Sequence, residues 1–418
     1  MPSSPAHTHG PDPDAPPPSP DALRRRRSAV WLMLLLLVPV GLATIVGLFV
    51  LWPSDEPTRA QQAAETFLPP GTTYPEGRVV SVEACPPEDE GCSATGVVEV
   101  LDGDGTGDYV SIGLPPDVVA SGVSEGDVLV LTRDAGAEGG PSYGFYDYER
   151  DAPVLVLAIL FAVVVVAVAR LRGLASLLGL AFAFFILLQF VLPGLLTGNS
   201  PTLVSLVGSA AIMFVVLYLA HGFSARTTTA LVGTLFGLTL VAVLGSVAVS
   251  AARLAGLTTD ETFQLNTFDP TLDFSGLVLA GIVVAGLGVL NDVTITQASA
   301  IWQLHEVSPD ITWRELYTRG MTVGRDHIAS TVYTIVFAYA GAALPALLLI
   351  NLYSRPLWTT ITSSLAEEVV RTLVGAIALV LAVPVTTAAG AFFAKAADTQ
   401  AGAATERRIS ALRARFAR

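Results

Sequence analysis

The stretch from Phe274 to Ala300 reads FSGLVLAGIVVAGLGVLNDVTITQASA, and it decides the fold class. Residues 274–290 are almost wholly apolar or small, and polar side chains follow them without any loop signal. An apolar run of this length is typical of a membrane-spanning helix, which needs about 20 residues to cross the hydrocarbon. Asn291 and Asp292 therefore belong to a helix that we expect to lie within a bilayer.

The composition of the whole chain supports this interpretation. Its 418 residues are 52% hydrophobic and 14% charged, with a mean hydropathy of +0.60, which indicates an integral membrane protein. The net charge of -13 is concentrated in residues 55–149, which hold nineteen acids against three arginines. We exclude nucleic acid as a partner, because no basic face of useful size exists outside the chain's ends.

The apolar stretches predict a mainly α, polytopic helical membrane protein with about eight spans. Four arginines, Arg24 to Arg27, precede the first stretch, which is too long for a cleaved signal peptide and is interpreted as a signal-anchor over residues 28–52. The other seven spans form a bundle within residues 151–396, at about 152–169, 174–196, 202–221, 228–251, 274–298, 328–351 and 370–394.

The distribution of basic residues sets the expected orientation. With the N-terminus inside, cytoplasmic segments hold sixteen of the 23 lysines and arginines, as expected of loops that are not translocated. Both termini then lie in the cytoplasm of a bacterial-type cell, and residues 53–150 lie outside it. The Pro-rich residues 1–27 are expected to be disordered, and the basic residues 397–418 to form an amphipathic tail on the inner leaflet.

Residues 53–150 are predicted to form a small extracytoplasmic β-barrel-like domain, because short runs of β-branched residues alternate there with turn signals. Cys85 and Cys92, the only two cysteines, are expected to form a disulfide outside the cell, with two free thiols as the alternative. The sequence DGDGTGD at 102–108 is read as a turn and not as a calcium loop, because no helix or late glutamate accompanies it. We predict no metal and no cofactor.

One stripe of the helix that begins at Phe274 combines small and polar residues. At 100° per residue its members fall within about 80° of one another; they are Gly281, Ala285, Gly288, Asp292, Thr296 and Ser299. The first three would let another helix pack closely. A mid-membrane carboxylate usually faces protein or water, so we predict that Asp292, with Asn291 beside it, is a transport or coupling group. Alternatively, Asp292 forms a structural ion pair near the cytoplasmic interface.

The next span supplies candidate partners through the sequence GRDH at 324–327. Arg325 would neutralise Asp292, and Asp326 would join Arg325 in a cytoplasmic gate or, alternatively, cap the start of the span. Thr331 would line the path with Thr296 and Ser299. His327 is read as an interfacial hydrogen-bonding residue, with a proton role as the alternative.

At these residues the chain resembles the YibE/YibF family of multispan membrane proteins. The resemblance covers roughly residues 70 to 395, and its motifs are FYDYER at 145–150, GLGVLNDVTITQASAIWQL at 286–304, GMTVGRDHIASTVYTIVFAYAG at 320–341 and LAVPVTT at 381–387. It implies an N-terminal anchor, an external β domain and a seven-span bundle of permease-like function.

We therefore expect a transporter or permease for a small solute, with a proton or cation coupled between the sixth and seventh spans. The alternative is a non-catalytic anchor or envelope sensor that displays the acidic β domain. We do not expect an enzyme: intramembrane aspartyl proteases also use two aspartates, but here VLN separates GLG from Asp292. The lipid bilayer is the expected partner, and a homo-oligomer is compatible with the sequence.

Overall fold

The computed structural model describes residues 20–54, 56–67, 71–83, 94–136, 140–352, 356–363 and 365–397. The chain divides into two compact units. The first, called the bundle, comprises Met1–Asp55, Leu171–Asn266 and Thr271–Arg418, and the second, called the sheet unit, comprises Glu56–Arg170 and Thr267–Pro270. Cys85 and Cys92 lie outside the described residues.

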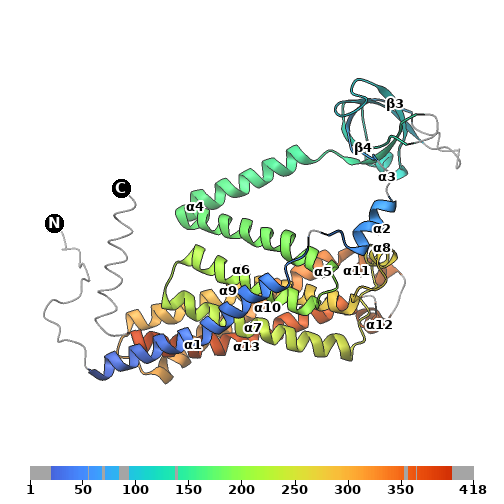
Figure 1. The fold of residues 1–418 in the computed structure, drawn as a ribbon. Helices are drawn as coiled ribbons and strands as arrows, with labels where there is room; N and C mark the ends of the chain where they lie inside the picture. Colours follow the sequence, from blue (N-terminus) through green and yellow to red (C-terminus); the bar gives the residue numbers. More distant parts are fainter. Residues whose placement is uncertain are drawn as a thin grey trace, which may run out of the picture. The chain divides into compact units, whose positions relative to one another are not determined.

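The sheet unit contains a curled five-stranded antiparallel sheet with the strand order β3-β2-β1-β4-β5 (Figure 1). The strands are β1 (Glu76–Glu83), β2 (Thr95–Val100), β3 (Tyr109–Gly113), β4 (Val128–Asp134) and β5 (Ser142–Tyr148). Alternate residues of β2 and β4 are buried, and Val98, Leu129 and Leu131 are completely enclosed, as the period of a strand with one core face requires. The helices of this unit include α2 (Arg59–Phe67) and α3 (Pro116–Ala120).

The predicted β domain is thus a curled sheet, and closure into a barrel is not confirmed. Strands β3 and β5 form the two edges of the sheet, and no strand pairing joins them within the described residues.

Long helices make up the bundle. They are α1 (Pro20–Val50), α6 (Pro201–His221), α7 (Ala225–Ala251), α9 (Phe274–Val307), α10 (Trp313–Ala342) and α13 (Ala366–Ala397). Shorter elements are η1 (Leu187–Val191), a π-helix, and α5 (Leu192–Leu196), α8 (Asp260–Phe268), α11 (Leu344–Leu352) and α12 (Leu357–Ile361). The helices α4 (Asp151–Ile186) and α8 each belong partly to both units.

Helices α7, α9 and α13 pack against one another at the centre of the bundle, and α6 and α10 contact them from the sides (Figure 1). Buried aliphatic side chains from all three central helices form the core, among them Val241, Leu290 and Ala378. Side-chain caps define where the helices begin: Asp273 accepts from the backbone N–H of Gly276 at the start of α9, and Thr312 accepts from that of Glu315 at the start of α10.

Six helical segments among the described residues are long and apolar enough to cross a membrane, so the predicted count of about eight is not confirmed. Two predicted spans fall in one helical segment, Asp151–Leu196, which is 46 residues long. At Arg170 this segment has φ 54° and ψ -133°, values that do not belong to a helix. A third predicted span, at 328–351, is divided between α10 and α11, and the six segments do not include it.

The region between the predicted sixth and seventh spans is more helical than expected. Helix α9 continues past the apolar segment to Val307, and α10 already begins at Trp313. The motif GRDH therefore lies inside α10. Asp326 cannot cap this helix, because the backbone amides in a helix interior are already bonded.

Candidate functional site

The polar stripe predicted on α9 is an open surface of the bundle. Gly288, Asp292 and Thr296 are exposed, and a Cβ atom placed on Gly288 would meet no other atom within 4 Å. These three residues are called the open face. Asp292 lies near the middle of α9, a helix of 34 residues, so its carboxylate is not at a frayed helix end.

Helix α10 contacts one end of the open face through His327. The Thr296 Oγ1 and His327 Nε2 atoms are 3.3 Å apart, within hydrogen-bonding distance. Thr296 also donates to the backbone oxygen of Asp292 over 2.7 Å, and Thr331 donates to the backbone oxygen of His327 over 2.9 Å. The structure therefore brings His327 beside Thr296, and Thr331, the other residue predicted to line a path, lies one turn from His327 along α10.

Arg325 does not neutralise Asp292 in this structure. Both side chains are exposed, and neither forms an ion pair with any described residue. Arg325 is two residues from His327 along α10, a rotation of about 200° around the helix. Since His327 faces α9, this rotation turns Arg325 away from it. Asp326 is also exposed, and the predicted gate of Arg325 with Asp326 stays a prediction.

Gly281, Ala285 and Gly288 were predicted to let another helix pack closely. The close contact with another helix is instead made at a different glycine of α9. A Cβ atom on Gly281 would have only the Arg371 Nη2 atom nearby, at 3.6 Å, and Ala285 is half-buried. On Gly286, by contrast, it would lie 3.0 Å from the Val241 Cγ2 atom of α7. Gly286 is two residues from Gly288 and thus on the opposite side of the helix, so the glycine that allows close approach belongs to the buried side.

A second set of polar residues lies inside the bundle, opposite the open face. Thr234, Thr294 and Thr387 have no exposed surface, and Gln297 is 2% exposed; these four are called the buried polar cluster. Thr234 and Thr294 share a hydrogen bond of 2.6 Å between α7 and α9. The Gln297 Nε2 group donates to the backbone oxygen of Gly320 over 2.9 Å and to Thr387 Oγ1 over 2.7 Å. The cluster thereby links α7, α9, α10 and α13.

The sequence reasoning did not predict this cluster, although it had a signal for it. Gln297 lies three residues after Thr294 and falls outside the predicted stripe. A search for a second polar side of α9 would have found both residues. What the sequence alone does not show is that their partners are Thr234 on α7, Thr387 on α13 and a backbone oxygen on α10.

A charged group lies at the start of α13. The Arg371 Nη1 group donates to both carboxylate oxygens of Glu368, over 2.8 Å each. Thr258 donates to Glu367 Oε2 over 3.1 Å. Two further atoms here, Arg371 Nε and Glu367 Oε1, are buried and have no hydrogen-bond partner among the described residues. Since Arg371 is also the neighbour of Gly281, this group covers the end of the predicted stripe that lies farthest from His327.

Two other predicted site residues lie beside the open face. Asn291 and Ser299 are both half-buried. The Asn291 Oδ1 atom is buried and accepts no hydrogen bond within the described part of the chain, so the structure does not place this predicted site residue on the open face. Among the described residues no group of three or more His, Cys, Asp and Glu side chains is arranged to hold a metal ion.

Comparison with protein families gives one match: the family described as YibE/F-like protein matches residues 157–396. This range includes α9, α10 and α13, and therefore the open face, the buried polar cluster and Arg371. No curated protein and no solved structure matches the chain.

Proposed function

We propose that this chain, which belongs to the family of YibE/F-like proteins, is a membrane transporter that moves a small solute along the open face of α9. One observation carries the proposal: Asp292 is exposed in the middle of a helix that is long and apolar enough to span a membrane. At 1.5 Å per residue, Asp292 lies about 27 Å along the helix from Phe274, which is near the cytoplasmic side of a hydrocarbon layer about 30 Å thick, and a carboxylate facing lipid there costs up to roughly 3 kcal/mol. A water-filled groove over the open face would remove this cost.

Each residue around the open face has a role in this proposal. Asp292 binds the coupling proton or cation, because it has no cation of its own among the described residues. The hydroxyl groups of Thr296 and Thr331 offer hydrogen bonds to a solute. Gly288 leaves room for it.

We place the outer end of the path at Arg371. Its guanidinium lies beside Gly281 and is held by Glu368, so the ion pair covers this end of the stripe. Access from outside would require the pair to separate or to swing aside. Its side chains are 24% and 38% exposed, so they are partly solvated and the movement is not opposed by full burial.

The proposed topology follows the distribution of Lys and Arg. Asp151–Leu196 would cross twice, with the break at Arg170 in the cytoplasm, and α10 with α11 would add a further crossing. This gives about eight crossings, with residues 53–150 outside the cell and both termini inside it. Arg371 is then near the outside, and His327 is near the cytoplasm.

The experiment compares three strains: one lacking the protein, one complemented with the wild type and one with Asp292→Asn. We expect the deletion to change the metabolite profile of cells and medium, the wild type to restore it and Asp292→Asn to fail, because an amide cannot take up the coupling proton. Asp310→Asn is the matched control, since Asp310 is an exposed carboxylate in the turn between α9 and α10, and it should restore the profile fully.

Two outcomes would contradict the proposal: a deletion that leaves every solute unchanged, or an Asp292→Asn variant that restores the profile. Either would favour the competing function, a non-catalytic anchor or envelope sensor that displays the acidic sheet unit. Immunoblots of membranes must show equal amounts of all variants.

A further inference from the structure

The strand order of the sheet unit is that of a particular β architecture. Every neighbouring pair in the order β3-β2-β1-β4-β5 is antiparallel, so the edge strands β3 and β5 run in the same direction. Strand β1 has a bulge between Val79 and Ser81 and pairs with both β2 and β4, and the helix α3 connects β3 to β4. Partly open five-stranded Greek-key barrels of the OB type have this arrangement, and many of them bind oligonucleotides or oligosaccharides.

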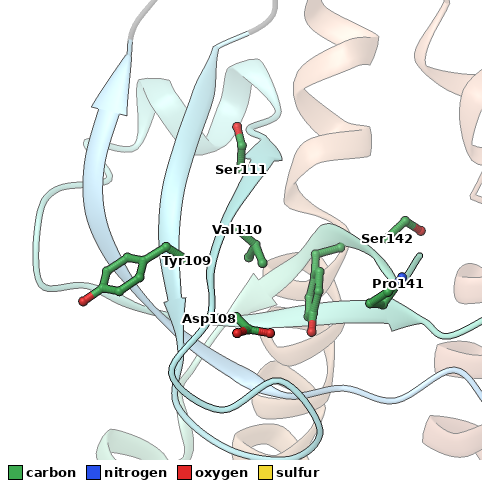
Figure 2. Close-up of a pocket in the computed structure, with 7 residues that line it drawn as sticks. Asp108, Tyr109, Val110, Ser111, Pro141 and Ser142 are labelled. Atoms are coloured by element: carbon green, nitrogen blue, oxygen red, sulfur yellow. The ribbon is translucent and has the colours of Figure 1, made fainter. Parts of the chain in front are cut away.

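Topology alone does not assign a ligand, but this sheet also has a groove at the gap between its edges. The groove has a volume of about 520 Å³. Figure 2 shows Asp108, Tyr109 and Val110 on the β3 side and Pro141 and Ser142 on the β5 side. The two sides come from segments that the topology brings together only because the sheet curls.

One aromatic residue of the groove is held in place from behind. Arg133 Nε donates to the Tyr143 hydroxyl over 3.2 Å, and this hydroxyl donates to the backbone oxygen of Asp104 over 3.3 Å. The Arg133 side chain is only 14% exposed and lies 3.7 Å from the Asp104 carboxylate. The ring of Tyr143 is therefore fixed before any ligand arrives, which reduces the entropy that binding must offset.

The polar groups that line the groove are free to bind a ligand. The Asp108 carboxylate and the hydroxyls of Ser111 and Ser142 form no side-chain hydrogen bond with the described residues, and the Tyr109 side chain is 65% exposed. Aromatic rings offer a flat apolar surface, and a carboxylate is a strong acceptor for hydroxyl or amino groups. A sugar ring presents both an apolar face and a rim of hydroxyl groups, so this lining suits it.

The charge of the surrounding residues further restricts the class of ligand that the groove can bind. Residues 55–149 hold nineteen acids and three arginines, and this field repels nucleic acids and other anionic chains. We propose that the groove between β3 and β5 binds an oligosaccharide of neutral or amino sugars, with Asp108 as the principal acceptor and the fixed ring of Tyr143 as the stacking surface. The proposal is independent of transport along α9.

The test uses the full-length protein in lipid nanodiscs and isothermal titration calorimetry. Three tetrasaccharides serve as probes: a glucosamine tetramer, which is cationic, cellotetraose, which is neutral, and a galacturonic acid tetramer, which is anionic. We expect the first two to bind and the third to bind about tenfold more weakly or worse.

Asp108→Asn should weaken binding of the glucosamine tetramer by about tenfold, the usual effect of losing a hydrogen bond to a charged acceptor. Tyr143→Leu removes the ring held in the groove and should weaken all probes. Asp117→Asn, at an exposed carboxylate on α3 outside the groove, should change nothing. Unchanged thermal unfolding of each variant excludes misfolding.

Three results would overturn the proposal. They are no binding of either the neutral or the amino-sugar probe, binding that Asp108→Asn leaves intact, or equal binding of the anionic probe. A neutral extended peptide is titrated alongside, because a sheet edge can also accept an added strand. Binding of the peptide in place of the sugars would assign the groove to strand addition and likewise overturn the proposal.

Discussion

On α9, Asp292 and Thr296 lie on the open side, whereas Thr294 and Gln297 lie on the side that packs against α7, α10 and α13. All four are polar residues within six consecutive positions of one apolar helix. The buried pair has hydrogen-bond partners on three neighbouring helices. Within the part of the chain that the structure describes, the open pair has only His327 as a side-chain partner on another helix.

This difference shows that polarity in a membrane helix serves two separate purposes. Polar residues with complete sets of partners hold helices together. Polar residues that keep an exposed surface at similar depth need water, a solute or another protein surface as a neighbour. Stability should therefore depend on the buried side of α9 and transport on the open side, and substitutions on the two sides can separate them.

The largest difference in stability is expected between substitutions of two glycines of α9. Gly286→Val places its side chain against Val241, where even a Cβ atom would lie at 3.0 Å, and should lower the free energy of unfolding by about 2 kcal/mol. Gly288→Val extends into open space and should change it by less than about 0.5 kcal/mol. Unfolding by SDS in mixed micelles, followed by tryptophan fluorescence, measures both. Equal losses would show that the open face is packed.

A smaller difference in the free energy of unfolding is expected between substitutions of two glutamines of α9. Gln297→Leu removes the hydrogen bonds to Gly320 and Thr387 and should cost about 1–2 kcal/mol, because each such bond in a membrane protein contributes only modestly. Gln303→Leu is the matched control on the same helix, since Gln303 is exposed, and it should be nearly neutral. The same SDS titration applies, and a neutral Gln297→Leu would mean that the cluster does not hold the helices together.

The smallest effect on stability is expected from Gly288→Cys in a Cys85→Ser, Cys92→Ser background. A hydrophilic maleimide should label this cysteine in membranes, because the reaction needs a hydrated thiolate. Ala298→Cys on the same helix should stay unlabelled, since Ala298 has no exposed surface. Labelling is read by mass spectrometry. If Gly288→Cys does not react, the open face is covered by lipid and not by a water-filled groove. If it forms a disulfide between two chains, a second copy of the chain covers the face.

Much of the fold could be predicted from the sequence because its signals are local. The apolar run from Phe274 and the alternation in TGVVEV at 95–100 each depend on neighbours within one helix or strand, and both α9 and β2 are found. The gap between the predicted spans 152–169 and 174–196 also begins at the non-helical residue Arg170. The early start of α10 was harder to predict. Helix α10 begins in the charged sequence WRELYTR, and hydropathy alone does not distinguish a charged helical extension from a loop.

The candidate site was less predictable, because its geometry depends on contacts between helices. The helical wheel placed Asp292 and Thr296 on one stripe, and the structure places both on one exposed side. The wheel could not tell that His327 and not Arg325 faces this side, since the answer depends on the rotation of α10. Arg371 is distant from Gly281 in the sequence, so the two residues become neighbours only when α9 and α13 pack together.

Threonine hydroxyls at the centre of the bundle are bonded to their own helices. Thr234, Thr294 and Thr387 each lie within donating distance of the carbonyl oxygen one turn earlier, at 3.0, 2.8 and 2.7 Å. In the assembled bundle either Thr234 or Thr294 donates to the other hydroxyl instead, because each hydroxyl has a single proton. Each helix can therefore enter the bilayer by itself with these hydroxyls already satisfied. Gln297 differs, because its amide is satisfied by Gly320 and Thr387 on two other helices. Insertion would then come first and association second, with Gln297 and the Thr234–Thr294 hydrogen bond favouring the assembled state.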